Sequence, residues 1–398
     1  MHELVLENGV KILIKKTRGK GIVSGVIFIK SGVHGETKRG LTNLVSVLLT
    51  KRTKDYDSYR IASTFEDYGG SISSVGTDDY VEVSFSTKME GLDEALKVVQ
   101  SMLYYSAFDQ EDIDREKDNI ITAIRSKRES GMELAMEHLR RLTFGVMDYS
   151  VSPLGSEEDV SSITRQMVVE RWKEVLKGGN VVVSIVGDIG DVPVEDMLRG
   201  VFSGIPGGMY NFEQKDVYVE SNAVVRVKRP GAQATVLCAF NASFIKDNDY
   251  FAFRVLNGVL GNGMTSKLFK ELREKRGYAY AKYSYYPTRL FSPRMFAYVG
   301  TSPDKAESVL KDLLETVRSS HITEEDVKLA KDKIIGDFLL DHQTRLRQAW
   351  YLGFYEVMGM GWKIDQEYPE RVKEVSLKDL LRIQKEYLDK YNCVIVEP

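Results

Sequence analysis

Histidines, the side chains that most often bind zinc through a helix, are few in this sequence and poorly spaced for a metal site. The histidines are His2, His34, His138, His321 and His342. No two of them lie three to five positions apart, so no helix presents two imidazoles one turn apart, as a helical zinc site requires. The stretch ELAMEH (residues 133–138) ends in Glu-His, but Leu134 stands where the first ligand would be. We interpret it as a solvated helical face.

Two other stretches carry residue types that could bind a ligand. Gly261 and Gly263 in LGNGMTSK could suggest a phosphate cradle, but the stretch lacks the spacing and the terminal GK[ST] of a P-loop. We interpret it as a turn before a helix, in which Gly263 allows a tight backbone. The tyrosines in residues 278–286 could line a peptide groove or pack within a strand with their hydroxyls toward water, and the sequence leaves both open.

The helix predicted within residues 40–53 (GLTNLVSVLLTKRT) has a regular core face and a second face of unclear purpose. Its leucines and Val45 recur at i, i+3, i+4 and i+7, which is typical of a helix packed on a core. The other face carries Asn43, Ser46 and, one turn after Asn43, the apolar Val47. None of these side chains suggests a reaction by itself.

Composition and charge indicate a globular protein with at least two domains. The chain has 398 residues, 43% of them hydrophobic and 28% charged, and its net charge of -3 gives no case for nucleic-acid binding. Its two cysteines, Cys238 and Cys393, cannot form a disulfide framework, and a reducing compartment is the simpler interpretation. We find neither a signal peptide nor an apolar run of about 20 residues that could span a bilayer. We therefore expect a cytoplasmic protein without a membrane partner.

The chain repeats itself at long range, which predicts a duplicated domain. QEDIDREKDNII (residues 110–121) returns as EEDVKLAKDKII 214 positions later, and the pair Leu96-Lys97 returns at the same offset. Asn180, before a C-terminal strand of the first copy, matches Asn392. Two copies of this size exclude a solenoid of short repeats.

Each copy is predicted to have an α+β fold. Alternating runs around Asn8-Gly9 predict a β-hairpin with a type I′ turn. Residues 21–33 and 80–87 predict further strands, and residues 58–68, 92–105 and 110–130 predict helices. In the second copy, residues 223–240 open the sheet and residues 268–286 form a helix that runs into a strand. The turn-rich residues 203–216 predict the connection between the copies.

The residues from 260 to 286 carry a resemblance to a known family. They combine a glycine-rich turn, a helix ending in LREKRG and a strand with an aromatic pair. In this stretch and in its two-copy layout, the chain resembles the pitrilysin–insulinase family of zinc peptidases, in particular its processing-peptidase-like branch. Residues 65–86 are similar to the family's segment around its substrate-binding edge strand. The resemblance implies two tandem homologous α+β domains, residues 1–208 and 209–398, that form a half-shell.

The resemblance also implies that the zinc motif of the first domain is lost. In this family the helix carries His-x-x-Glu-His, in which two histidines bind Zn²⁺ and the glutamate takes a proton from the metal-bound water. The alignment puts Asn43 and Val47 at the histidines and Ser46 at the glutamate. The third ligand, a downstream glutamate, falls at Ala123. We therefore expect no metal cofactor in this chain.

A second pair of residues matches the family's second domain. Arg273 and Tyr280, seven positions apart in LREKRGYAY, match an Arg/Tyr pair that holds the substrate carbonyl and stabilises the oxyanion. A guanidinium and a phenol are suited to donate hydrogen bonds to a developing negative charge. Without the family context, a surface arginine beside an edge-strand tyrosine is the plainer interpretation.

Taken with the lost zinc motif, the Arg/Tyr pair leads to our main hypothesis. The chain would be a non-catalytic, substrate-binding subunit of a heteromeric zinc peptidase acting on short or unfolded peptides. A similar chain with an intact zinc motif would be the partner and would carry the Zn²⁺, and the isolated chain could form a homodimer. The alternative is a structural or peptide-binding protein with no peptidase partner. A peptidase with unconventional ligands has little support.

Overall fold

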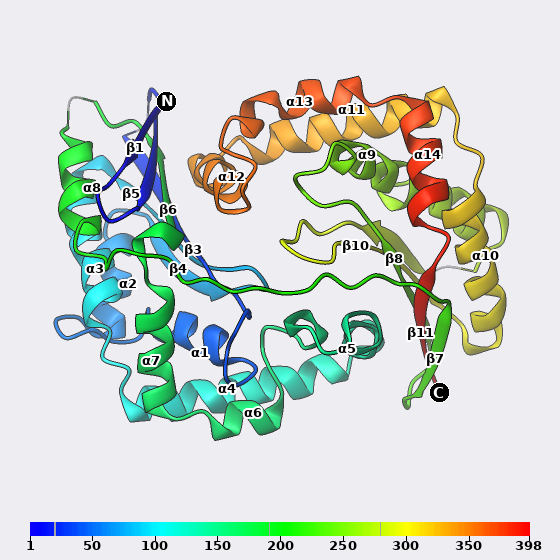
Figure 1. Cartoon of the computed structure of the whole chain (residues 1–398), viewed down its shortest axis with the longest axis horizontal. Coiled ribbons are helices and arrows are strands. Elements are labelled where there is room, and N and C mark those ends of the chain that lie inside the picture. Colours follow the sequence, from blue (N-terminus) through cyan, green and yellow to red (C-terminus); the bar gives the residue numbers. More distant parts are fainter. Residues whose placement is uncertain (20, 191, 279) are drawn as a thin grey trace. The chain divides into compact units, whose positions relative to one another are not determined.

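The computed structural model of the chain describes residues 1–19, 21–190, 192–278 and 280–398. The chain forms two compact units (Figure 1). Unit 1 comprises Met1–Ile124, Val151–Glu213 and Asp341–Asp365, and unit 2 comprises Arg125–Ser150, Gln214–Leu340 and Gln366–Pro398. Each unit therefore takes segments from both halves of the sequence. The predicted boundary between residues 208 and 209 concerns the repeat along the chain, which this spatial division does not test, and it stays a prediction.

Unit 1 contains a six-stranded sheet in the order β1-β2-β6-β3-β5-β4. Its strands are β1 (His2–Val5), β2 (Lys11–Lys16), β3 (Ile22–Lys30), β4 (Ser71–Gly76), β5 (Tyr80–Lys88) and β6 (Val181–Gly187). β2 pairs with β6 in parallel, and the other neighbours are antiparallel. β4 is an edge strand of this sheet.

One face of this sheet carries the main apolar core of the unit. Val23, Ile27 and Ile29 of β3 belong to this core, together with residues of seven helices. These helices are α1 (Leu41–Leu48), α2 (Ser58–Glu66), α3 (Leu92–Tyr105), α4 (Gln110–Arg128), α6 (Glu157–Ser162), α7 (Arg165–Val175) and α8 (Val194–Phe202). The two-residue period of a strand turns Phe28 to the opposite face.

A helix from the second half of the sequence covers that opposite face. α12 (Arg345–Val357) packs against β3 and β6, and it is the orange helix beside β3 in Figure 1. A Cβ at Gly353 would lie 2.6 Å from the ring of Phe28, so only glycine allows this approach. The hydroxyl of Ser184 donates a hydrogen bond to the carbonyl of Ala349 over 2.6 Å. A segment from the second half of the sequence thus completes the layer on this face of the sheet.

Unit 2 is built in a similar way around a five-stranded sheet in the order β7-β11-β8-β10-β9. Its strands are β7 (Ala223–Lys228), β8 (Ala234–Asn241), β9 (Ala281–Tyr285), β10 (Arg294–Thr301) and β11 (Tyr391–Glu397). α5 (Gly131–Phe144), from the first half of the sequence, packs on β8 and β11. α9 (Tyr250–Gly261) packs on β9, and α10 (Ala306–Ser319) packs on β10 and β8. The two copies thus exchange one helix each.

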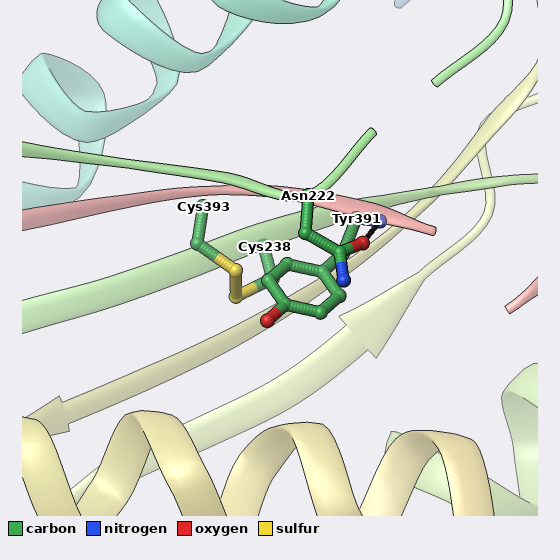
Figure 2. Close-up of a disulfide and its surroundings, with 4 residues drawn as sticks. All are labelled: Asn222, Cys238, Tyr391 and Cys393. Carbon is green, nitrogen blue, oxygen red and sulfur yellow. Dashed lines mark hydrogen bonds between the residues drawn. A yellow bond between two sulfur atoms is a disulfide. The ribbon is translucent and has the colours of Figure 1, made fainter. Parts of the chain in front are cut away.

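The two cysteines lie opposite each other in the sheet of unit 2. Cys238 of β8 and Cys393 of β11 are register partners and form a disulfide with their Cα atoms 4.1 Å apart (Figure 2). Both are fully buried, and beside them the amide of Tyr391 donates to Oδ1 of Asn222 over 3.2 Å. The structure pairs the two cysteines, against the expectation drawn from their small number. Their 155-residue separation gave no sign of the pairing, which strand register creates.

Most of the predicted elements are confirmed, with one local correction. The hairpin around Gly9 forms, and Gly9 has a φ of 93°. A type I′ turn requires positive φ at both central residues, but Phe108 and Ser292 are the non-glycine residues of the described chain with positive φ, and Asn8 is not among them. The predicted turn type was therefore wrong. Among the described residues, no helix is long and apolar enough to cross a bilayer.

Candidate functional site

The helix that would carry a zinc motif begins at a glycine held by a carboxylate. Gly40 precedes α1 with a φ of 93°. The side chain of Glu36 accepts hydrogen bonds from the amides of Gly40 (3.0 Å) and Thr42 (2.9 Å), which are free donors at a helix start. Burial raises the pKa of Glu36 to about 7, although these hydrogen bonds and the nearby Arg171 act to lower it. The carboxylate orders the start of the helix.

The Asn43–Ser46 face of α1 is closed by strand β4. A Cβ at Gly76 would lie 2.9 Å from Cα of Asn43 and 3.2 Å from Oγ of Ser46. Ser46 is fully buried and donates its hydroxyl to the carbonyl of Asn43 over 2.7 Å. Asn43 is 7% exposed, and its Nδ2 is a buried donor without a hydrogen-bond partner. This face is packed too tightly for larger side chains.

The other two positions predicted to match zinc-site residues of the family are apolar. Val47 is partly buried and packs against the main core, and Ala123 is a partly buried residue of α4. Neither an amide, a hydroxyl nor an aliphatic side chain can supply the imidazole or carboxylate ligands that Zn²⁺ prefers. Among the residues that the structure describes, no group of three or more His, Cys, Asp or Glu side chains could hold a metal ion.

A buried carboxylate does remain near this helix, but it is paired. Glu116 of α4 is 7% exposed, and its Oε1 lies 3.0 Å from the Nζ of Lys51, just past α1. Oε1 also lies 3.7 Å from Arg115. Two cations therefore balance the charge of Glu116, which removes it as a simple metal ligand.

The histidines are distributed as the sequence predicts. His34 is buried against Asp79 (3.1 Å), His342 contacts Asp365 (2.7 Å), and His2 contacts Glu195 (2.7 Å) on the surface. His138 lies on α5 in the ELAMEH stretch, where Glu137 forms ion pairs with Arg128 and Arg141. Three of the histidines thus contact single carboxylates, and none of the three is grouped with a second histidine.

In unit 2, Arg273 lies on a π-helix. Residues Phe269–Lys275 form this helix (η4), a rare geometry that is frequent at functional sites. Gly277 follows its C-terminal end, with a φ of 62° and an amide that donates to the carbonyl of Arg273 over 3.1 Å. Arg273 is exposed, and its guanidinium carbon lies 5.5 Å from the ring centre of Phe269. The turn presents Arg273 to solvent.

Arg273 differs from its basic neighbours in having no carboxylate partner. Lys275 pairs with Glu271 (2.7 Å), and Arg276 pairs with Glu271 (3.4 Å) and with Asp312 (3.0 Å). Within the described residues, no carboxylate lies within ion-pairing distance of Arg273.

Lys282 of β9 shares this excess of positive charge. Its Nζ lies 4.1 Å from the same Phe269 ring that Arg273 overlies. Burial lowers the pKa of Lys282, and the positive charge of Arg273 lowers it further. A region with two cations on one ring and no balancing carboxylate in the described chain favours the approach of an anion or of a carbonyl oxygen.

Tyr280 and the following tyrosines have different environments. Tyr280 is 66% exposed, and its amide donates to the carbonyl of Gly300 over 3.0 Å, which fixes the entry into β9. In contrast, Tyr285 stacks on Phe296 at 4.9 Å, and Tyr286 is buried with its hydroxyl bonded to the carbonyl of Ser243. The packing interpretation therefore holds for Tyr285 and Tyr286, whereas Tyr280 remains available to a ligand.

The glycine-rich turn has the predicted structural role. Gly263 has a φ of 100°, and a Cβ at Gly261 would lie 2.2 Å from the amide nitrogen of Ser284. The turn thus allows α9 to approach β9 closely. The sequence analysis missed Glu36 and Gly76, both of which shape the α1 region. A glycine at the end of a predicted strand is a known sign of close backbone approach and could have pointed to Gly76.

Two family models match most of the chain. The model described as insulinase (peptidase family M16) matches residues 11–152, and the model described as peptidase M16 inactive domain matches residues 162–334. The uncharacterized zinc protease YmxG of Bacillus subtilis (strain 168) is 22% identical, with 98% of this chain and 97% of the relative covered. The zinc protease PqqE of Helicobacter pylori is 21% identical, with coverages of 97% and 90%.

Solved structures show the same fold over the whole chain. The peptidase M16 inactive domain from Pseudomonas fluorescens matches with a TM-score of 0.93 and 19% identity, covering 100% of this chain and 97% of that one. A protease from Helicobacter pylori matches with a TM-score of 0.92 and 18% identity, with coverages of 100% and 99%. The predicted fold class, two α+β domains in tandem, is confirmed.

Proposed function

Because the chain belongs to the peptidase M16 (insulinase) family, we propose that it is a non-catalytic, substrate-binding subunit of a heteromeric zinc peptidase. The substrates would be short or unfolded peptides. The observation that carries the proposal is the state of Arg273, which is exposed and lacks a carboxylate partner in the described chain, while Lys275 and Arg276 beside it are both paired. An unpaired guanidinium and an exposed phenol are both groups that can donate a hydrogen bond to a carbonyl or an oxyanion.

The region of α1 supports the non-catalytic part of this proposal. Asn43, Ser46, Val47 and Ala123 offer neither a ligand set for Zn²⁺ nor a base that could take a proton from water. Hydrolysis of a peptide bond therefore needs a metal-activated water supplied by another chain. The partner would be a similar chain with an intact His-x-x-Glu-His motif.

The edge strand β4 supports the peptide-binding part. Its sequence, SISSVG, contains no charged residue and no proline, and its exposure alternates along the strand. Ser71, Ser73 and Val75 are exposed. Edge strands usually carry charges, prolines or bulges that block pairing with another chain. A bare edge strand can accept an extended peptide through backbone hydrogen bonds.

The proposal is tested by reconstitution with a zinc-bearing partner. The two chains are co-purified, the complex is confirmed by its size, and cleavage of an unstructured peptide is measured. The chain alone should show no peptidase activity and should retain well below one zinc per molecule after dialysis. Addition of this chain should raise the partner's activity strongly.

The matched variants are Arg273→Ala and Lys275→Ala. Both remove one positive charge from η4, but only Arg273 lacks an ion pair. Loss of stimulation in Arg273→Ala and its retention in Lys275→Ala would support the proposal. If both variants assemble and stimulate like the parent, the alternative of a structural or peptide-binding protein replaces ours. Stoichiometric zinc in the chain alone would overturn the non-catalytic assignment.

A further inference from the structure

Unit 1 contains a cavity of about 500 Å³ outside the α1 region. It lies among the end of α3, the residues that follow it, helix α7 and Pro206. Leu103, Phe108, Trp172 and Leu176 supply apolar walls. Its volume falls within the roughly 300–1,000 Å³ typical of small-molecule sites.

The polar side chains of the cavity wall are mostly engaged within the protein. The guanidinium of Arg165 donates to the carbonyls of Phe108 (2.8 Å) and Ala107 (3.1 Å). The indole N–H of Trp172 donates to the carbonyl of Leu103 over 2.9 Å. The hydroxyl of Tyr104 donates to the carbonyl of Val201 over 2.7 Å. A ligand therefore finds few free hydrogen-bond donors among these groups.

Two ammonium groups are the exception. Lys173 and Lys177 both line the cavity, and Lys173 is exposed while Lys177 is partly buried. In the described part of the chain, neither has a carboxylate within 4.0 Å. The carboxylate nearest in sequence, Glu174, pairs with Arg171 instead (3.1 Å). The cavity thus combines apolar walls with two unbalanced positive charges.

The backbone at the cavity is unusual as well. Phe108 is one of two non-glycine residues in the described chain with positive φ, at 47°. Such a conformation is unfavourable for a residue with a side chain and occurs often at binding sites. The carbonyl of Phe108 is the acceptor that Arg165 holds. This unfavourable turn keeps the aromatic ring in the cavity wall.

We propose that this cavity binds an amphipathic aliphatic carboxylate, with the chain against the apolar wall and the carboxylate beside Lys173 and Lys177. A peptide is less suitable, because its amide groups would be buried against walls whose polar groups are already bonded. A phosphate is also less suitable, because the guanidinium that could bind it in a bidentate manner is engaged with backbone carbonyls. The site does not depend on the peptidase role proposed above.

The probe is decanoate, titrated below its micelle concentration and followed by calorimetry. Decan-1-ol has the chain without the charge, acetate has the charge without the chain, and decyltrimethylammonium has the opposite charge. We expect saturable one-to-one binding of decanoate and at least about tenfold weaker binding of the other three. Equal affinity for decanol, or no saturable binding of decanoate, would overturn the proposal.

Variants locate the site. Val169→Trp fills the cavity and should abolish decanoate binding, because Val169 lines it. The double variant Lys173→Met and Lys177→Met should weaken decanoate binding about tenfold and leave decanol binding unchanged. Lys311→Met, which removes an exposed lysine from α10 in unit 2, is the matched control and should bind like the parent. Unchanged decanoate binding in either cavity variant would overturn the placement of the site. If Val169→Trp misfolds, the double lysine variant still tests the placement, because it leaves the apolar core intact.

Discussion

The two regions that the sequence predicts to match active-site positions of this family have opposite local structures. On α1, the side chains Asn43 and Ser46 are buried, and strand β4 packs against them so closely that Gly76 has no room for a Cβ. On η4, Arg273 is exposed and has no carboxylate partner in the described chain, and Tyr280 is 66% exposed. One region is closed by packing, and the other is open.

Under the proposed function, this difference would follow from the loss of a zinc site and the retention of the Arg/Tyr pair. If the zinc ligands are replaced by small or apolar residues, the helix can keep its core face. Its second face can then pack closely, because it no longer has to stay open for a metal ion and a substrate. An exposed arginine at a helix end contributes little to stability. Under the proposed function its exposed guanidinium, which has no ion pair in the described chain, serves ligand binding, and the following predictions test that contrast.

The largest effect is expected at the open region. In complex with a zinc-bearing partner, Arg273→Ala or Tyr280→Phe should reduce the stimulated turnover by roughly 10²–10³, or about 2.7–4 kcal/mol, because each removes one donor to the oxyanion. Unfolding midpoints should stay unchanged, since both side chains are exposed. The measurements are peptide cleavage and thermal unfolding, with Lys275→Ala as the control. A drop in unfolding midpoint with unchanged turnover would show that these side chains serve stability and not ligand binding.

At the closed region, the expected effect is on stability. Gly76→Ala should destabilise unit 1 by about 1–3 kcal/mol, because its Cβ meets the backbone of Asn43 at 2.9 Å. The matched control is Gly336→Ala in helix α11 (Glu324–Asp341), where nothing lies within 4 Å of the added carbon. That variant should gain up to about 1 kcal/mol. Denaturant unfolding of both variants measures the difference, and equal stabilities would show that the α1 face is loosely packed.

The start of α1 should make the stability of the protein depend on pH. The pKa of Glu36 is raised to about 7, so the native state binds this proton more tightly than the unfolded state. Its contribution to stability is present below its ordinary pKa and is lost as the pH rises through about 7. The slope is at most about 1.4 kcal/mol per pH unit for one proton.

Glu36→Gln should remove this slope between about pH 5 and 7, while Glu90→Gln, at an exposed position, should keep it. Unfolding free energies of the three proteins over this pH range give the comparison. A slope that persists in Glu36→Gln would assign the pH dependence to other groups.

The smallest effect is expected at Asn43. Its Nδ2 is buried without a partner, so the near-isosteric Asn43→Leu should be neutral or stabilising by up to about 1 kcal/mol. The control is Asn180→Leu, which removes an amide that donates to the carbonyls of Lys30 (2.8 Å) and Tyr210 (3.0 Å) and should destabilise the protein. Chemical unfolding distinguishes the two. Strong destabilisation by Asn43→Leu would show that its amide has a structural role.

The sequence alone determined the duplication, the family and the types of most elements. Apolar periodicity predicted α1 and α3, and the repeat offset predicted two similar α+β copies. The candidate residues also came from the sequence, since the predicted loss of the zinc ligands rests on residue identity at the positions that the family resemblance aligns. These properties are local or periodic, so they can be read along a chain.

Tertiary structure alone decided how the units are completed and which candidate residues are exposed. α5 and α12 cover sheets that belong to the opposite half of the sequence, because each sheet needs an apolar layer on both faces. Strand register, which no spacing reveals, brought Cys238 to Cys393 across 155 positions. In the same way, Gly76 approaches Asn43 closely only in the folded chain. Whether Arg273 has an ion pair also depends on which distant residues the fold places near it.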